Sequence, residues 1–251
     1  MRQYILVIIL LLATLSVYSI GQQDYIIKAN KAYSAGSYTT AAELYNKVVV
    51  AGYESPELFY NLGNTYFKMN DYGHAILWYE RAKRLDPGNE DIDFNLNVAN
   101  TKISDKIEPL PELFYKRWFN VVLQLFSADT WAAIGIILFI AGLLGGVLYL
   151  ASQRLFLRKI GFWAAFGLLF MAFFTLLFAW SNYSFTKSTI EAIVFAPTIT
   201  VKSSPDDKST DLFVVHEGTK VRLLDNINGW YEIKIANGSV GWLPSASLEK
   251  I

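Results

Sequence analysis

The main feature of the hydropathy pattern is a pair of long apolar runs. Residues 131–150 and 161–180 are each 20 residues long and hold no Asp, Glu, Lys or Arg. At about 1.5 Å rise per residue, each helix would cross a hydrocarbon layer roughly 30 Å thick. Buried helices of a soluble domain are the alternative, but we predict transmembrane helices. Gly142 and Gly146 either permit close helix contact or reflect the abundance of glycine in membrane helices.

Residues 1–21 form a third apolar segment, with the pattern of a secretory signal peptide. Arg2 precedes an apolar run, and the small residues Ser19 and Gly21 stand where cleavage after residue 21 requires them. An uncleaved membrane anchor is the alternative. Both interpretations send the chain from residue 22 onward across the membrane.

The loop at 151–160 sets the orientation of the two predicted spans. It contains three cations and no acidic residue: Arg154, Arg158 and Lys159. Short loops rich in Lys and Arg stay in the cytoplasm. We therefore expect this loop to be cytoplasmic, and residues 22–130 and 181–251 to lie on the opposite side of the membrane.

A repeat with a period of 34 residues precedes the spans. The key positions of its second copy are Phe59, Leu62, Gly63, Tyr66, Tyr72, Ala75, Tyr79, Ala82 and Pro87, and those of its first copy are Tyr25, Ala29, Ala32, Tyr38, Ala41, Tyr45 and Val48. Small residues let paired helices approach, and the tyrosines fill the gaps between them. The pattern resembles tetratricopeptide repeats, which implies stacked helix pairs over residues 22–105. We expect a partial third unit at 89–107 to serve as a capping helix.

This resemblance implies a peptide-binding groove lined by the first helix of each pair. The residues expected to contact a partner are Asn30, Tyr33, Tyr60, Asn61, Asn64, Phe67 and Lys68, beside Ile26. In one subgroup of the family, asparagines and cations hold the C-terminal carboxylate of a peptide. Asn30 and Asn61 match those asparagines, but Ile26, Asp91 and Asn95 stand where the cations belong. The alternative is that the asparagines only bond to the backbones of neighbouring helices.

A linker at 106–130 joins the repeats to the first span. It begins with two prolines, which end the helical array. Beyond them an apolar stripe recurs at helical spacing, at Phe114, Trp118, Val121, Val122 and Leu125. We expect an amphipathic helix at 112–126 that lies in the membrane interface. Packing of this stripe against the repeats is the alternative.

The C-terminal segment, residues 190–251, has the alternating pattern of short strands. Strand positions at Val221, Leu223, Tyr231, Ile233, Ile235 and Val240 are separated by turns at Asn228-Gly229 and Asn237-Gly238. We predict a small all-β barrel of about five strands. The run "GWYEIKIANGSVGWLPSASL" resembles bacterial SH3-like domains, and this resemblance implies binding of peptidoglycan or protein. Trp230 and Trp242 are the candidate contact residues, and burial of both rings in the barrel core is the alternative.

Composition excludes several functional classes. The 22 basic residues balance the 22 acidic ones, so nothing favours nucleic acid as a partner. The chain has no cysteine, which excludes disulfides and thiol catalysis. It has only two histidines, His74 and His216, so few of the usual ligands for a metal site are present. We expect no cofactor and no metal, and we do not expect an enzyme.

The order of signal peptide, repeats, membrane hairpin and barrel resembles the BatE family, the repeat proteins of the Bacteroides-type aerotolerance operon. The resemblance implies a bacterial inner-membrane protein with its repeats and barrel in the periplasm. It also implies partners: membrane-anchored proteins with von Willebrand A domains and a MoxR-type ATPase complex, in stress tolerance or envelope maintenance. We therefore expect a multidomain membrane protein that acts as a non-catalytic scaffold. The alternative is an envelope protein that binds peptidoglycan and is anchored by the hairpin.

Overall fold

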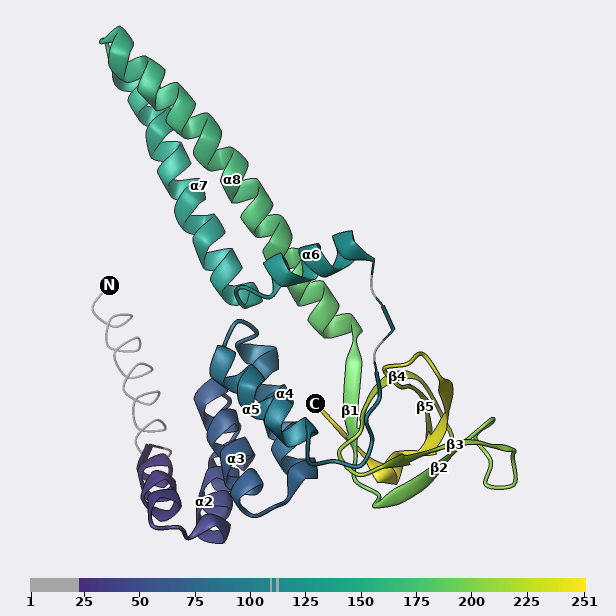
Figure 1. The fold of residues 1–251 in the computed structure, drawn as a ribbon. Coiled ribbons are helices and arrows are strands. Elements are labelled where there is room, and N and C mark those ends of the chain that lie inside the picture. The colour runs from purple at the N-terminus through teal and green to yellow at the C-terminus, as the bar shows by residue number, and fades with distance from the viewer. Residues whose placement is uncertain (1–22, 109, 112) are drawn as a thin grey trace, which may run out of the picture. The chain divides into compact units, whose positions relative to one another are not determined.

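The computed structural model describes residues 23–108, 110–111 and 113–251, so the predicted signal peptide lies outside the described residues. The chain forms two compact units (Figure 1). One unit holds the repeats together with the C-terminal strands, in the segments up to Leu85, Asn89–Pro109 and Glu191–Ile251. The other holds the linker helix and the two long apolar helices, in the segments Asp86–Gly88 and Leu110–Ile190.

The repeat region of the first unit is built from paired helices. They are residues 23–34, α2 (Tyr38–Val50), α3 (Pro56–Lys68), α4 (Tyr72–Leu85) and α5 (Glu90–Asn100). Ser55 begins α3, where its side chain accepts a hydrogen bond from the backbone N–H of Leu58, and Asn89 does the same for the N–H groups of Asp91 and Ile92 in α5. These caps satisfy donors that the first turn of a helix leaves free. The predicted helical-repeat fold is confirmed.

Close helix contact in the repeats depends on the small residues of the pattern. A Cβ atom at Gly63 on α3 would lie 2.5 Å from two ring carbons of Tyr79 on α4. Around this contact a core forms from Tyr45, Leu62 and Trp78 with other buried side chains. The 34-residue period therefore encodes where helix α3 can approach α4.

The C-terminal segment folds into a seven-stranded sheet with antiparallel pairing, in the order β3-β2-β6-β5-β4-β1-β7. The strands are β1 (Ile190–Val194), β2 (Thr198–Lys202), β3 (Asp211–His216), β4 (Lys220–Ile227), β5 (Trp230–Lys234), β6 (Val240–Pro244) and β7 (Leu248–Lys250). Asn228 and Gly229 both have positive φ, which suits the tight hairpin turn between β4 and β5. The all-β fold is confirmed, but the expected count of about five strands is too low. The pattern missed β1 and β7, which pair with each other at the two ends of the domain sequence.

The sheet also covers the repeats, which the sequence pattern did not predict. Ile193 of β1 is fully buried in a cluster with Ala75, Ile76 and Leu77 of α4 and with Leu96 of α5. Helix α4 is consequently buried on several faces. The capping helix α5 is present as expected, and strand β1 completes the burial that a repeat end requires.

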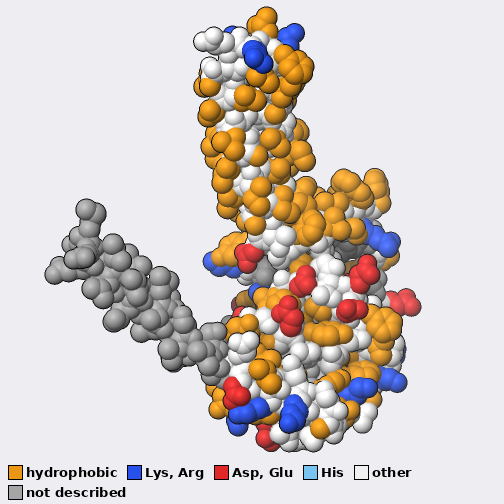
Figure 2. Space-filling model, turned by 90° about the vertical axis from the view of Figure 1, so that its left-hand side faces the viewer, with side chains coloured by type: hydrophobic (Ala, Val, Ile, Leu, Met, Phe, Trp, Pro, Cys, Tyr) orange, Lys and Arg blue, Asp and Glu red, His pale blue; other side chains and the backbone are white. Residues whose placement is uncertain are grey.

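The second unit consists of α6 (Phe114–Leu123), α7 (Ala128–Ala151) and α8 (Leu155–Ser188). Helices α7 and α8 are long and apolar enough to cross a membrane, and only 11% of each apolar window is buried. Such low burial is unlike the core helix of a soluble domain. Figure 2 shows hydrophobic side chains over the hairpin and Lys and Arg side chains at its tip.

The hairpin departs from the expected loop at 151–160. Helix α8 already begins at Leu155, so the turn is only residues 152–154, and Arg158 and Lys159 lie in the first turns of α8. The hydropathy pattern placed the basic residues in a loop because they are charged. Lys and Arg are nevertheless good helix formers, so the helix can begin before the apolar run. The guanidinium of Arg158 lies 5.3 Å from the ring centre of Tyr149, which keeps the cation beside the hairpin end.

Glycines of α7 and α8 lie in their contact. A Cβ atom at Gly161 would lie 2.7 Å from the backbone nitrogen of Tyr149, and one at Gly142 would lie 2.8 Å from Leu169. A Cβ atom at Gly146 or Gly167 would meet nothing within 4 Å. Close contact therefore explains Gly142 but not Gly146, so the Gly-x-x-x-Gly spacing itself is not the contact motif.

Candidate functional site

A groove on the inner helices of the repeats brings together four of the predicted partner-binding residues. Its volume is about 280 Å³, and it is lined by Tyr33, Asn64, Phe67, Lys68, Tyr79, Asn95 and Val98. These side chains come from four helices: the first helix of each unit, which are the helix at 23–34, α3 and α5, and α4, which supplies Tyr79. The arrangement is open to a chain segment with both apolar and polar groups.

A chain of hydrogen bonds fixes the polar side of this groove. The hydroxyl of Tyr79 donates to Asn64 Oδ1 at 2.7 Å, and Asn95 Nδ2 donates to the same oxygen at 2.9 Å and to the hydroxyl of Tyr60 at 2.8 Å. Burial raises the pKa of Tyr79, so its hydroxyl keeps its proton and acts as the donor. Asn64 is thereby held in one orientation, and Lys68 at the edge of the groove is exposed.

The other predicted groove residues play different parts. Asn30 accepts a hydrogen bond from the hydroxyl of Tyr45 at 2.5 Å, which is the same contact, one 34-residue period earlier, as that between Asn64 and Tyr79. Asn30 thus bonds within the array, as the alternative expected, but to a side chain and not to a helix backbone. Tyr60 does not line the groove itself, but its hydroxyl accepts a hydrogen bond from Asn95, which does. Asn61 is not among the residues that line the groove.

Three lining residues were not predicted as partner contacts: Tyr79, Asn95 and Val98. The pattern marked Tyr79 only as a packing residue. Asn95 stands where the carboxylate-binding subgroup has a cation, so the pattern gave it no binding role. A signal was nevertheless available, because Asn95 follows Asn61 by one repeat period and Val98 follows Asn64 by one period.

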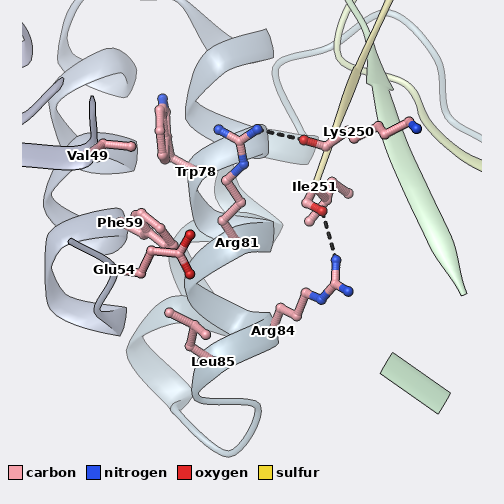
Figure 3. A pocket seen from close by; sticks show the side chains of 9 residues that line it. All are labelled: Val49, Glu54, Phe59, Trp78, Arg81, Arg84, Leu85, Lys250 and Ile251. Carbon is pink, nitrogen blue, oxygen red and sulfur yellow. Dashed lines mark hydrogen bonds between the residues drawn. The ribbon is translucent and has the colours of Figure 1, made fainter. Parts of the chain in front are cut away.

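A second hollow, of about 520 Å³, opens where α4 meets the last residues of the sheet (Figure 3). Phe59, Trp78 and Leu85 supply apolar walls, and two arginines and Glu54 add charge. Arg81 lies over the ring of Trp78 at 4.5 Å and donates to the backbone oxygen of Lys250 at 2.6 Å. Arg84 donates to the backbone oxygen of Ile251 at 2.8 Å. Both arginines therefore help to hold the last strand against α4.

The two candidate tryptophans of the barrel share one face of the sheet. Strand pairing sets Trp230 opposite Pro244 and Glu232 opposite Trp242, so the four side chains point the same way. The adjacent residues Ile233 and Leu243 point into the barrel core instead. Trp230 and Trp242 are partly exposed, and neither belongs to the buried core, contrary to the core alternative.

Each histidine pairs with a carboxylate. His74 Nδ1 lies 2.8 Å from both carboxylate oxygens of Asp71, and this hydrogen bond raises the pKa of His74. His216 Nδ1 lies 2.7 Å from Asp105. Burial would raise the pKa of Asp105, but hydrogen bonds from Thr219 and His216 outweigh it and leave the pKa lowered. Within the described ranges, no group of three His, Asp or Glu side chains could hold a metal ion.

Comparison with protein families assigns both modules. The family model described as tetratricopeptide repeat matches residues 56–89, the second of the two predicted copies. The family model described as bacterial SH3 domain matches residues 197–249. A search of the curated proteins gave no significant match. Both families are interaction modules that are typically non-catalytic. The chain thus has one segment similar to a tetratricopeptide repeat, one similar to a bacterial SH3 domain, and two helices long and apolar enough to span a membrane.

Proposed function

We propose that the protein is a non-catalytic, membrane-anchored scaffold that binds partner proteins through its repeats and its SH3 domain. The observation that carries this proposal is the groove around Asn64. Hydrogen bonds from Tyr79 and Asn95 fix the orientation of Asn64. Phe67 and Lys68 also line the groove and can contact a ligand. A preorganised groove binds with less loss of conformational entropy than a flexible one. A segment of a partner with an apolar side chain and an acidic neighbour fits these groups.

Purification of partners tests the groove directly. We would isolate the tagged full-length chain in mild detergent and compare it with Lys68→Glu, which reverses the charge at the edge of the groove. Lys68 is exposed, so the variant should fold normally. A matched control is Lys31→Glu, on an exposed position of the first helix that does not line the groove. Proteins that copurify with wild type and the control but not with Lys68→Glu support the proposal, and identical sets from all three oppose it.

We also propose that the repeats and the SH3 domain lie in the periplasm of a bacterial inner membrane. Support comes from the cations at the hairpin end, Arg154, Arg158 and Lys159, because positive flanks resist translocation. Reporters that are active only after export, fused after Phe156 and after Ile251, test this topology. Activity of the reporter at Phe156 with none at Ile251 would contradict the proposed topology and indicate the opposite orientation.

The finer assignment is membership in a complex of the BatE type, with von Willebrand A proteins and a MoxR-type ATPase. The order of the modules along the chain supports it. Mass spectrometry of the copurified proteins tests it, since the two implied partner classes are recognisable from their own sequences. Absence of both classes, from preparations that retain other membrane complexes, would remove this assignment and leave the general scaffold.

A second candidate is peptidoglycan binding by the SH3 domain. It is favoured by the partly exposed Trp230 and Trp242 on one outward face, because aromatic rings suit stacking on sugar rings. The full-length chain should be used, because Ile193 of this domain is buried among the repeat helices. Sedimentation with purified sacculi that is lost in Trp242→Ala supports this candidate, and sedimentation no greater than that of an unrelated membrane protein rejects it.

A further inference from the structure

Helix α6 has three distinct faces. Phe119 and Leu123 point toward the long helices, since the ring of Phe119 lies 6.0 Å from that of Phe178 and Leu123 is buried. Lys116, Arg117 and Asn120 form a polar face, which Gln124 continues at the C-cap. Between these faces runs an exposed apolar stripe of Phe114, Trp118 and Val121, which Leu125 continues in the turn after the helix; these four side chains are 84%, 69%, 57% and 53% exposed. Large apolar side chains exposed in a row mark an interaction surface.

Polar contacts fix this helix to the hairpin. Asn182 of α8 donates from Nδ2 to the backbone oxygens of Leu123 and Phe126, at 3.3 and 3.1 Å. The indole nitrogen of Trp131, at the start of α7, donates to the oxygen of Leu123 at 3.2 Å. These bonds satisfy carbonyls that the C-terminal end of α6 leaves free. The orientation of the apolar stripe is thus tied to the hairpin.

The attachment point lies about one bilayer thickness from the cationic tip. From Ile160, directly after the last cation, to Asn182 there are 22 residues of α8, which is about 33 Å at 1.5 Å per residue. This length matches a hydrocarbon layer of roughly 30 Å. The contact between Phe119 and Phe178 joins the apolar surface of α6 to that of the hairpin. Helix α6 therefore sits at the level where one bilayer face would meet water.

We infer that α6 is an in-plane membrane anchor whose apolar stripe is covered by lipid at the bilayer face opposite the cationic tip. The inference rests on the proposed insertion of the hairpin. Lipid is the occupant that the structure favours, because the stripe continues an apolar surface that lipid itself would cover. Lys116 and Arg117 on the neighbouring face can meet lipid phosphates there.

Depth measurement by single-cysteine spin labelling tests this inference, and the absence of native cysteine makes the labelling specific. The full-length chain is reconstituted in vesicles of phosphatidylethanolamine and phosphatidylglycerol. Labels are placed on the stripe at Phe114→Cys and Val121→Cys, on the polar face at Lys116→Cys and Gln124→Cys, and on α7 at Leu144→Cys. Each label is scored by its collision rate with oxygen, which concentrates in lipid, relative to a water-soluble nickel complex.

We expect the oxygen-to-nickel ratio at the two stripe positions to be several-fold higher than at the polar positions and to approach that at Leu144. A lipid value at Leu144 with water-like values on the stripe would overturn the inference and leave the hairpin anchored. Low collision rates with both reagents on the stripe would also overturn it, because protein would then cover the stripe. A water-like value at Leu144 would refute the membrane anchoring itself.

Discussion

Removal of the Asp105 carboxylate should loosen the SH3 domain from the repeats. Asp105 follows the last repeat helix, yet its hydrogen-bond donors lie in the barrel: the backbone N–H of His216 donates to its carboxylate at 2.8 Å and the hydroxyl of Thr219 at 2.6 Å. Thr219 is only 3% exposed, so water cannot readily replace the lost acceptor. A buried donor left unsatisfied costs about 1–3 kcal/mol. Since His216 is only partly buried, water can replace part of its lost bond, so Asp105→Ala should cost about 2–4 kcal/mol for the two donors together.

Hydrogen exchange followed by mass spectrometry measures this loss in the full-length chain. In detergent micelles at constant pH, amides of β3 and of the turn to β4 should exchange about 30 to 700 times faster in Asp105→Ala, since 1.4 kcal/mol corresponds to a factor of ten. Asp105→Asn keeps one oxygen acceptor and should show a smaller effect. Asp207→Ala, on an exposed turn, should change stability by no more than about 0.5 kcal/mol.

The charge of Asp105 adds a pH dependence to the same measurement. Because its pKa is lowered in the folded protein, its stabilising contribution is present above the ordinary carboxyl value of about 3.9 and is lost as the pH falls through the lower folded value. The difference between wild type and Asp105→Ala should therefore shrink in acid. Exchange in Asp105→Ala within a few-fold of wild type at neutral pH would refute the proposed junction.

Three further substitutions test other parts of the structure. Gly63→Ala should destabilise the repeats by about 1–3 kcal/mol, because its Cβ would meet the Tyr79 ring at 2.5 Å; faster amide exchange in α3 and α4 is the readout, and unchanged exchange contradicts it. Gly161→Val should widen the distance distribution between spin labels on α7 and α8, whereas Gly167→Val, which meets nothing within 4 Å, should leave it unchanged. Because the pKa of His74 is raised, the stability that its pair with Asp71 contributes is fully present below the ordinary histidine value of about 6.5 and is lost as the pH rises through the higher folded value. Opening of the α3–α4 turn in wild type should therefore increase as the pH rises above about 6.5. A His74→Gln variant should lack this dependence, and equal slopes would argue against the pair with Asp71.

The candidate groove was only partly predictable from the pattern. Tyr33, Asn64, Phe67 and Lys68 were found because each repeat places its inner helix face at a fixed offset in the sequence. Asn95 was not predicted to line the groove, because the third unit departs from the repeat pattern and Asn95 lacks the charge that the carboxylate-binding subgroup has at this position. Its two hydrogen bonds depend on side chains more than 30 residues away, and periodicity does not encode such pairing.

The sequence by itself determined the local architecture: two long apolar helices, a helical period of 34 residues and a series of short strands with tight turns. These features follow from helix rise, strand alternation and turn geometry, all of which act over a few residues. Only the tertiary structure decided that Ile193 seals the end of the repeats, that Asp105 receives hydrogen bonds from residues more than 110 positions later, and that the α6 stripe is left exposed. Such contacts depend on which surfaces complement each other after folding, and no local spacing of residues records that choice.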